Sequence, residues 1–136
     1  MMMLNLTNNI TSLNKMFLNC SAVDAEINYD LFRHCPNVTN ITSFAEGTSL
    51  RGGIYSRTPD YSESDSTTWG TFDFLSGLEQ ASNAFSSAAL QYIDDNVFAP
   101  INGTYINLRE ADYMFSNCYN LESCQVVNRN NIVQNG

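Results

Sequence analysis

The hydrophobic residues of the chain recur with a spacing that predicts short helices. In three places, apolar residues stand seven, four and one positions before a phenylalanine, and a small residue stands three positions after it. This spacing follows one face of a helix with about 3.6 residues per turn. Around Phe44 the spacing is compressed to three residues, with Val38 and Ile41 before it, which is typical of a shorter or 3₁₀-like turn. The three phenylalanines that anchor the longer pattern are Phe17, Phe85 and Phe115.

Short extended segments follow the helical patterns. They lie at residues 50–55, 90–93 and 121–126, where apolar, β-branched or aromatic residues are common. Gly52 and Gly53 indicate a bulge or turn inside the first of these segments. The predicted unit is therefore a helix, a short strand and a turn that carries a buried phenylalanine. The phenylalanines that close most units are Phe32, Phe74 and Phe98.

The intervals between the main phenylalanines indicate a repeat. Phe17, Phe44, Phe85 and Phe115 are 27, 41 and 30 residues apart, and the long middle interval contains a polar, acidic insertion at about residues 56–70. One unit cannot bury its apolar face alone, whereas stacked units form a continuous core. We therefore expect an α/β fold, a short solenoid of about four helix–strand units. It forms a single repeat domain over residues 1–127, which a polar tail follows at residues 128–136.

The composition supports one folded domain and excludes several classes of partner. The chain has 136 residues, of which 43% are hydrophobic and 15% charged, so it is too apolar to be disordered. Its net charge of −8 repels phosphate groups, and we expect no nucleic-acid partner. No apolar run approaches the roughly 20 residues that a membrane-spanning helix needs, so no membrane insertion is expected. The N-terminus lacks the pattern of a signal peptide.

The cysteines and the single histidine are the first candidates for metal or redox chemistry. Cys20, Cys35, Cys118 and Cys124 form no Cys-x-x-Cys pair, and His34 has no ligand-like spacing around it. A Cys–His nucleophile would need the two side chains to face each other, which adjacent residues do not do. We therefore expect buried thiols and a surface histidine, with neither a zinc site nor a cofactor.

Two further groups of residues are candidates for binding a cation or a protein. The carboxylates of Asp94 and Asp95, with Asn96, could hold a divalent cation, but a turn between repeats explains them as well, and we expect no metal. Tyr61 and Trp69 stand in the acidic insertion, and aromatic residues in a polar loop are common anchors of protein interfaces. They are the candidate protein-binding residues, although Trp69 could equally pack over the core of the neighbouring unit.

Phrases repeated along the chain resemble those of BspA-like leucine-rich repeats. The family phrase has Ala or Met before a Phe, with Cys three residues after that Phe and Leu beyond it. Here it is represented by Met16-Phe17-Leu-Asn-Cys20, Ala84-Phe85-Ser-Ser-Ala88 and Met114-Phe115-Ser-Asn-Cys118. The resemblance covers nearly the whole chain outside the insertion and the tail, but two units lack the Cys and the unit length is irregular. It implies a leucine-rich-repeat-like solenoid without catalytic residues, as in adhesins of bacterial and protozoan surfaces and in large phage proteins.

Two functions follow as expectations, and neither is enzymatic. The first is a repeat module for protein recognition or adhesion, which binds its partner through a concave face or through the insertion. The alternative is a structural component of a larger assembly, such as a phage virion or a cell-surface layer, or a fragment of a longer repeat protein, with neighbouring subunits as partners. The alternative rests on the abrupt start of the chain and on the lack of an evident polar capping unit at either end. Both favour a cell surface or a virion as the location.

Overall fold

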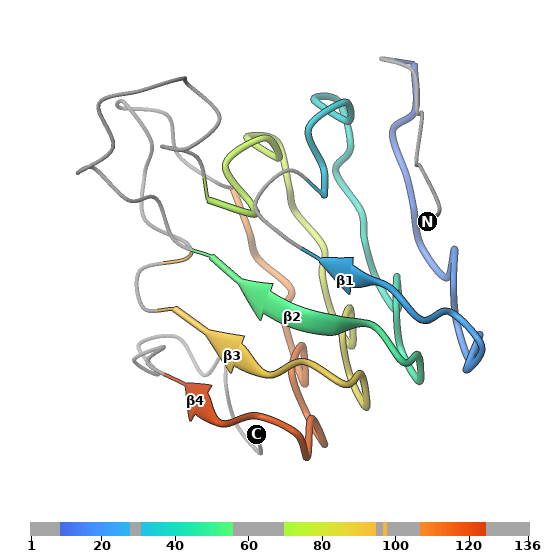
Figure 1. Ribbon diagram of the computed structural model, residues 1–136. Helices are drawn as coiled ribbons and strands as arrows, with labels where there is room; N and C mark the ends of the chain where they lie inside the picture. The colour runs from blue at the N-terminus through green and yellow to red at the C-terminus, as the bar shows by residue number, and fades with distance from the viewer. Residues whose placement is uncertain (1–8, 28–30, 56–69, 95–96, 98–106, 125–136) are drawn as a thin grey trace.

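Four stretches of chain lie one beside the next and give the molecule its shape. The computed structural model describes residues 9–27, 31–55, 70–94, 97 and 107–124. We call the four long stretches coils 1 to 4, in chain order. Figure 1 shows them side by side, with coils 1 and 4 at opposite ends of the stack and each coil folding back on itself at a tight turn.

Each coil contributes one short strand to a parallel sheet. The strands pair in chain order, so every strand lies beside the strands of the preceding and following coils. They are β1 (Glu26–Ile27), β2 (Arg51–Ile54), β3 (Tyr92–Ile93) and β4 (Ser123–Cys124).

A second parallel ladder joins the coils before the turns. It consists of single bridges from coil to coil between equivalent residues that are 28, 40 and 30 residues apart: Ser12, Asn40, Gln80 and Glu110. These intervals differ from the predicted 27, 41 and 30 because Phe44 occupies the position of Met16 in coil 1, one residue before Phe17. The compressed spacing expected around Phe44 is therefore an ordinary unit read one residue out of register.

The prediction of an α/β solenoid made of helix–strand units is wrong, because the described residues contain no helix. The segments expected to be helical form turns whose N–H groups alternate between two kinds of partner. Lys15 and Phe17 each donate to a carbonyl of coil 2 over 2.8 Å, whereas Met16 donates back to the carbonyl of Leu13 over 3.2 Å. An α-helix directs its N–H groups to the carbonyl four residues earlier, so this alternation is incompatible with one.

Two left-handed backbone positions in each coil fix these turns. Eight residues have φ between 53° and 73°, and their intervals match the 28, 40 and 30 residues of the ladder. A left-handed conformation costs about 1–2 kcal/mol for most side chains, and in coils 1 to 3 the hydrogen bonds to the next coil offset that cost. The first position in each coil holds Lys15, Ser43, Asn83 or Tyr113, and the second holds Asn19, Gly47, Ser87 or Asn117.

The core is a continuous row of phenylalanine rings that crosses all four coils. The ring centroids of Phe17 and Phe44 are 5.5 Å apart, those of Phe44 and Phe85 6.0 Å, and those of Phe85 and Phe115 6.0 Å with the rings nearly parallel. Phe32 and Phe72 extend the row on one side. Aromatic pairs at these distances add to the hydrophobic stabilisation of the core.

At two adjacent positions, coils 2 and 3 carry a large and a small side chain in opposite order. Coil 2 has Phe44 followed by Ala45, and coil 3 has Ala84 followed by Phe85 in the reverse order; all four side chains are fully buried. A large ring in one coil therefore lies beside a methyl group in the next, which preserves the density of the core.

Two cysteines are buried as predicted, and one is not. Cys35 and Cys118 are buried, and burial raises the pKa of the Cys35 thiol. The Cys118 thiol donates to the carbonyl of Phe85 over 3.1 Å. Cys20 is exposed, contrary to expectation, because it belongs to coil 1 at the end of the stack, and the side chain of Cys124 lies outside the described part. Within that part, no helix could cross a membrane and no three His, Cys, Asp or Glu residues gather as metal ligands do.

Replacing Phe85 with alanine is expected to reduce the free energy of unfolding by about 3–5 kcal/mol. The Phe85 ring is fully buried and contacts rings of both neighbouring coils. Denaturant titration measures the loss, with Tyr119→Ala as a control, since the Tyr119 side chain is 88% exposed. Equal stabilities of the two variants would show that Phe85 is not part of the core.

Replacing Ser87 with glycine is expected to raise the free energy of unfolding by about 1 kcal/mol, because Ser87 is exposed and has a left-handed φ of 58°. Ser82, in the same turn, is not left-handed, and Ser82→Gly should lower stability by about 0.5–1 kcal/mol. Thermal unfolding of both variants compares them. A helix over this segment would make both substitutions destabilising.

Candidate functional site on the outer face of the sheet

Most residues predicted from sequence to bind something lie outside the part of the chain that the structure describes. Tyr61 and Trp69, in the insertion, are among them, as are Asp95 and Asn96. Asp94 is described and follows β3 directly, where it is partly buried. The structure therefore brings none of these predicted residues together into a site.

The residues that the structure does gather lie on the outer face of the sheet, and two glycines of β2 form the floor of this region. Gly53 of β2 and Ser123 of β4 each lie six residues after the second left-handed position of their coil, whereas Tyr92, which pairs with both, lies five residues after Ser87. Gly52 has a φ of 89°, and a Cβ there would lie 2.6 Å from a carbonyl oxygen of β1. Glycine adopts this φ without the strain that a side chain would add.

Two tyrosines lie on this floor. The ring of Tyr92 covers Gly53 and occupies the space that a side chain at position 53 would need. The Tyr55 ring meets it edge to face, with centroids 5.2 Å apart, and the two hydroxyl groups are hydrogen-bonded. Partial burial raises the pKa of Tyr92, and the hydrogen bond to Tyr55 and the negative charges of Asp94 and Glu26 raise it further.

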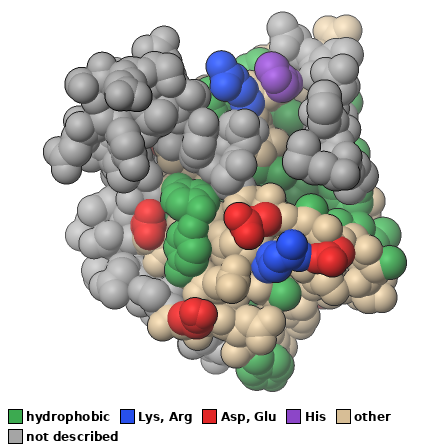
Figure 2. Space-filling model, viewed as in Figure 1, with side chains coloured by type: hydrophobic (Ala, Val, Ile, Leu, Met, Phe, Trp, Pro, Cys, Tyr) green, Lys and Arg blue, Asp and Glu red, His purple; other side chains and the backbone are tan. Residues whose placement is uncertain are grey.

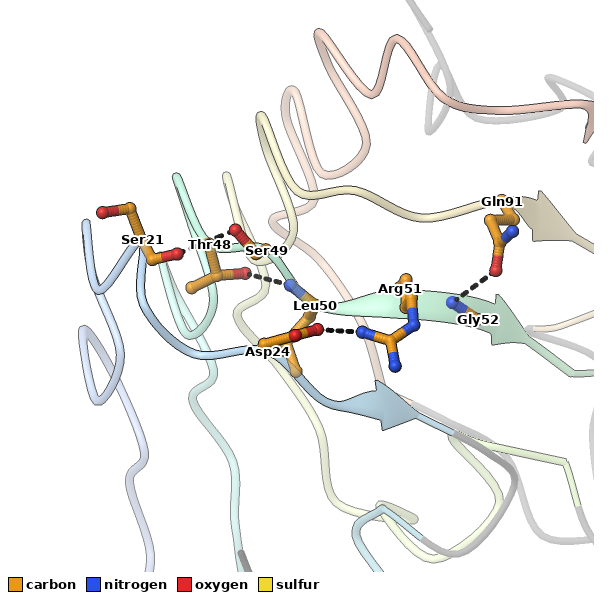
Figure 3. A network of polar contacts seen from close by, with 8 residues as sticks. All are labelled: Ser21, Asp24, Thr48, Ser49, Leu50, Arg51, Gly52 and Gln91. Atoms are coloured by element: carbon orange, nitrogen blue, oxygen red, sulfur yellow. Dashed lines mark hydrogen bonds and ion pairs between the residues drawn. The ribbon is translucent and has the colours of Figure 1, made fainter. Parts of the chain in front are cut away.

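Polar contacts between coils hold the margin of this face (Figure 3). Asp24 of coil 1 pairs with Arg51 of β2, and the Gln91 side-chain oxygen accepts the N–H of Gly52 over 3.2 Å. The Ser49 hydroxyl donates to the carbonyl of Ser21 over 2.7 Å. Each contact joins neighbouring coils, so the side chains around the tyrosines are anchored to more than one coil.

The charge of this face is predominantly negative. Asp24, Glu26, Asp94 and Glu122 lie in or beside its strands, and Arg51 is the one positive side chain there among the described residues. Because Arg51 pairs with Asp24, the excess is carried by the other three carboxylates. Figure 2, which views the molecule in the same orientation as Figure 1, shows hydrophobic side chains between acidic ones on this side.

This arrangement provides aromatic rings, hydroxyl groups and carboxylates, which can bind a ligand through packing, hydrogen bonds and ion pairs. No nucleophile and base are joined by a hydrogen bond in the described part of the chain. His34 is exposed in the turn of coil 2, whereas its neighbour Cys35 is buried. The geometry thus supports binding and gives no basis for assigning a reaction.

No family model, curated protein or solved structure matches the chain. The inference of function therefore rests on the geometry of the sheet face and on the resemblance carried by the repeated phrases.

Sequence reasoning missed Tyr55 and Tyr92 as site residues. They are 37 residues apart, and the register between coils 2 and 3 brings them together. A signal was present in the pair Gly52 and Gly53, since adjacent glycines inside an apolar strand often mark a close approach of another group.

The raised pKa of Tyr92 predicts a loss of stability in alkali. Because the folded state holds the proton more tightly, its stabilisation is complete below the ordinary tyrosine pKa of about 10 and is lost as the pH rises above that value. Urea unfolding at a series of pH values should therefore give a steeper alkaline decline in wild type than in Tyr92→Phe. Parallel declines would show that Tyr92 titrates alike in the folded and unfolded chains.

Proposed function

We propose that this protein is a non-enzymatic recognition module that binds a protein partner through the outer face of β1 to β4. The partner surface that fits this face is basic. The observation that carries the proposal is the Tyr55–Tyr92 pair, fixed on a glycine floor and surrounded by carboxylates.

The tyrosine pair has the physical properties of an interface anchor. Tyrosine offers a large contact area with few rotatable bonds and is enriched among residues that dominate binding energy. Packing against Gly53 and the hydrogen bond between the hydroxyls already order both rings. Ordering before binding reduces the entropy lost when the partner arrives.

The surrounding charge favours a partner that carries arginine or lysine. A guanidinium group can stack on a tyrosine ring and, at the same time, form paired hydrogen bonds with a neighbouring carboxylate. Glu26 and Asp94 are both close enough to Tyr92 to raise its pKa, so they are placed to receive such a group. The net charge of −8 also speeds the approach of basic partners at low salt.

The resemblance to BspA-like repeats supports adhesion as the setting of this recognition. The alternative, a structural part of a virion or cell-surface layer, would use the ends of the stack as its contacts.

The test uses peptides of defined charge. A set of peptides with the same apolar residues and with Arg, Gln or Glu at the same positions is titrated into the protein by calorimetry. The Arg peptide is expected to bind best, and Tyr92→Ala is expected to weaken its binding by about tenfold or more. Tyr119→Ala, at an exposed site outside the sheet, is the matched control and should leave binding unchanged.

Binding that is equal for the Arg and Glu peptides would contradict a basic partner. Binding of the Arg peptide that survives Tyr92→Ala would place the interface elsewhere. The far-ultraviolet circular dichroism of each variant must match that of wild type, so that loss of folding is not mistaken for loss of the site.

A further inference from the structure

The hydrogen bonds between the turns of neighbouring coils, which we call the turn ladder, all run in the same direction along the stack. Within the stack, four N–H groups of each coil donate to four carbonyls of the next, and the twelve hydrogen bonds are 2.7–2.9 Å long. In coil 1 the donors are Leu13, Lys15, Phe17 and Asn19. In this ladder, the N–H groups of coils 1 to 3 donate to the following coil, and the carbonyls of coils 2 to 4 accept from the preceding coil.

The two ends of the stack leave complementary halves of this ladder unused. In coil 4, the four equivalent N–H groups have no hydrogen-bond partner among the described residues; they belong to Ala111, Tyr113, Phe115 and Asn117. In coil 1, the four carbonyls equivalent to those that accept in the other coils are likewise without a partner there; they belong to Ser12, Asn14, Met16 and Leu18. Each set has the spacing that the other requires.

At each end, one side chain beside the ladder is more exposed than its equivalents inside the stack. Met16 is 39% exposed, whereas Phe44, Ala84 and Met114, at the same position in coils 2, 3 and 4, are fully buried. Tyr113 of coil 4 is 50% exposed. Unpaired ladder groups beside exposed apolar side chains are the features that promote pairing with another chain.

We propose that two copies of this chain associate head to tail, with coil 4 of one copy stacked in register on coil 1 of the other. The four N–H groups of coil 4 donate to the four carbonyls of the second copy's coil 1 and continue the ladder. Because the two surfaces differ, the contact is heterologous and leaves a free end on each side, so association can continue to longer assemblies.

Charges beside the turns fit this register. Lys15 is the only Lys or Arg in residues 9–27, and it occupies the ladder position equivalent to Tyr113. In the stacked pair, Lys15 of the second copy lies beside Tyr113 and next to the position of Asp112, which is also exposed. Opposite charges on neighbouring segments favour the contact, and they offset the repulsion between the carboxylates of Glu26 and Glu122 at the sheet side of the junction.

The experiment measures self-association by sedimentation velocity over a range of protein concentrations. Wild type is expected to form species larger than a monomer as concentration rises. Lys15→Glu and Asp112→Lys each place like charges together at the junction and are expected to weaken association by about tenfold. An equimolar mixture of the two variants makes both junctions attractive again, so association should return. Arg33→Glu, at an exposed position of coil 2, makes the same change of charge as Lys15→Glu away from the junction and is the control that should leave association unchanged.

Amide hydrogen exchange gives a second measurement. The N–H groups of Tyr113 and Phe115 should exchange readily in dilute protein and become protected as assemblies form. A monomer at all concentrations, or protection of these amides in the monomer, would overturn the proposal, because the latter means that the chain's own residues cover coil 4. Self-association that is as strong in Lys15→Glu and Asp112→Lys as in wild type would also overturn it. None of these results bears on peptide binding at the sheet face, so the two proposals fail separately.

Discussion

The structure depends on the backbone hydrogen bonds that pass from one turn to the next. Each turn directs alternate N–H groups to the following coil and the groups between them to carbonyls three residues back. No coil can satisfy this pattern alone, and none can bury its apolar side chains without a neighbour. The ladder therefore sets the register, and the register determines which phenylalanines meet in the core. Left-handed conformations at residues such as Lys15 and Asn83 persist because their N–H groups take part in the ladder.

The spacing of apolar residues indicated recurring segments, but it did not indicate their backbone conformation. Successive turns closed by hydrogen bonds three residues back place positions i and i+3 on one side, as a helix does, so Leu13 and Met16 fit either structure. The left-handed positions would have separated the two, but only Gly47 among the eight is a glycine. Three others are asparagines, which tolerate this conformation but are common throughout the chain, and lysine, serine and tyrosine give no such signal. The register of coil 2 could not be predicted for a related reason. Ala45, not Phe44, is equivalent to Phe17, so aligning the two phenylalanines shifts coil 2 by one residue.

The sheet face could be predicted even less. Its floor depends on the register that places Tyr92 of coil 3 beside Gly53 of coil 2, and its two tyrosines come from different coils. Composition did indicate the charge of the face, since an excess of carboxylates must lie on the surface. The aromatic residues selected from sequence, Tyr61 and Trp69, were chosen for standing in a polar loop. Nothing in the sequence distinguishes Tyr55 and Tyr92 as surface residues, because aromatic residues in a strand more often belong to a core.

Charge separates the two proposed surfaces. A copy of this chain carries a net charge of −8, and long-range repulsion between two such copies opposes any contact between them. The sheet face adds carboxylates to that repulsion, so it favours a basic partner over a second copy. At the ends of the stack the balance differs, because Lys15 is the one cation of coil 1 and meets the side of coil 4 that carries Asp112. Backbone donors and acceptors there carry no net charge and act only at short range. The same ladder that builds the core thus leaves the ends as the surfaces where an acidic chain can stack on itself.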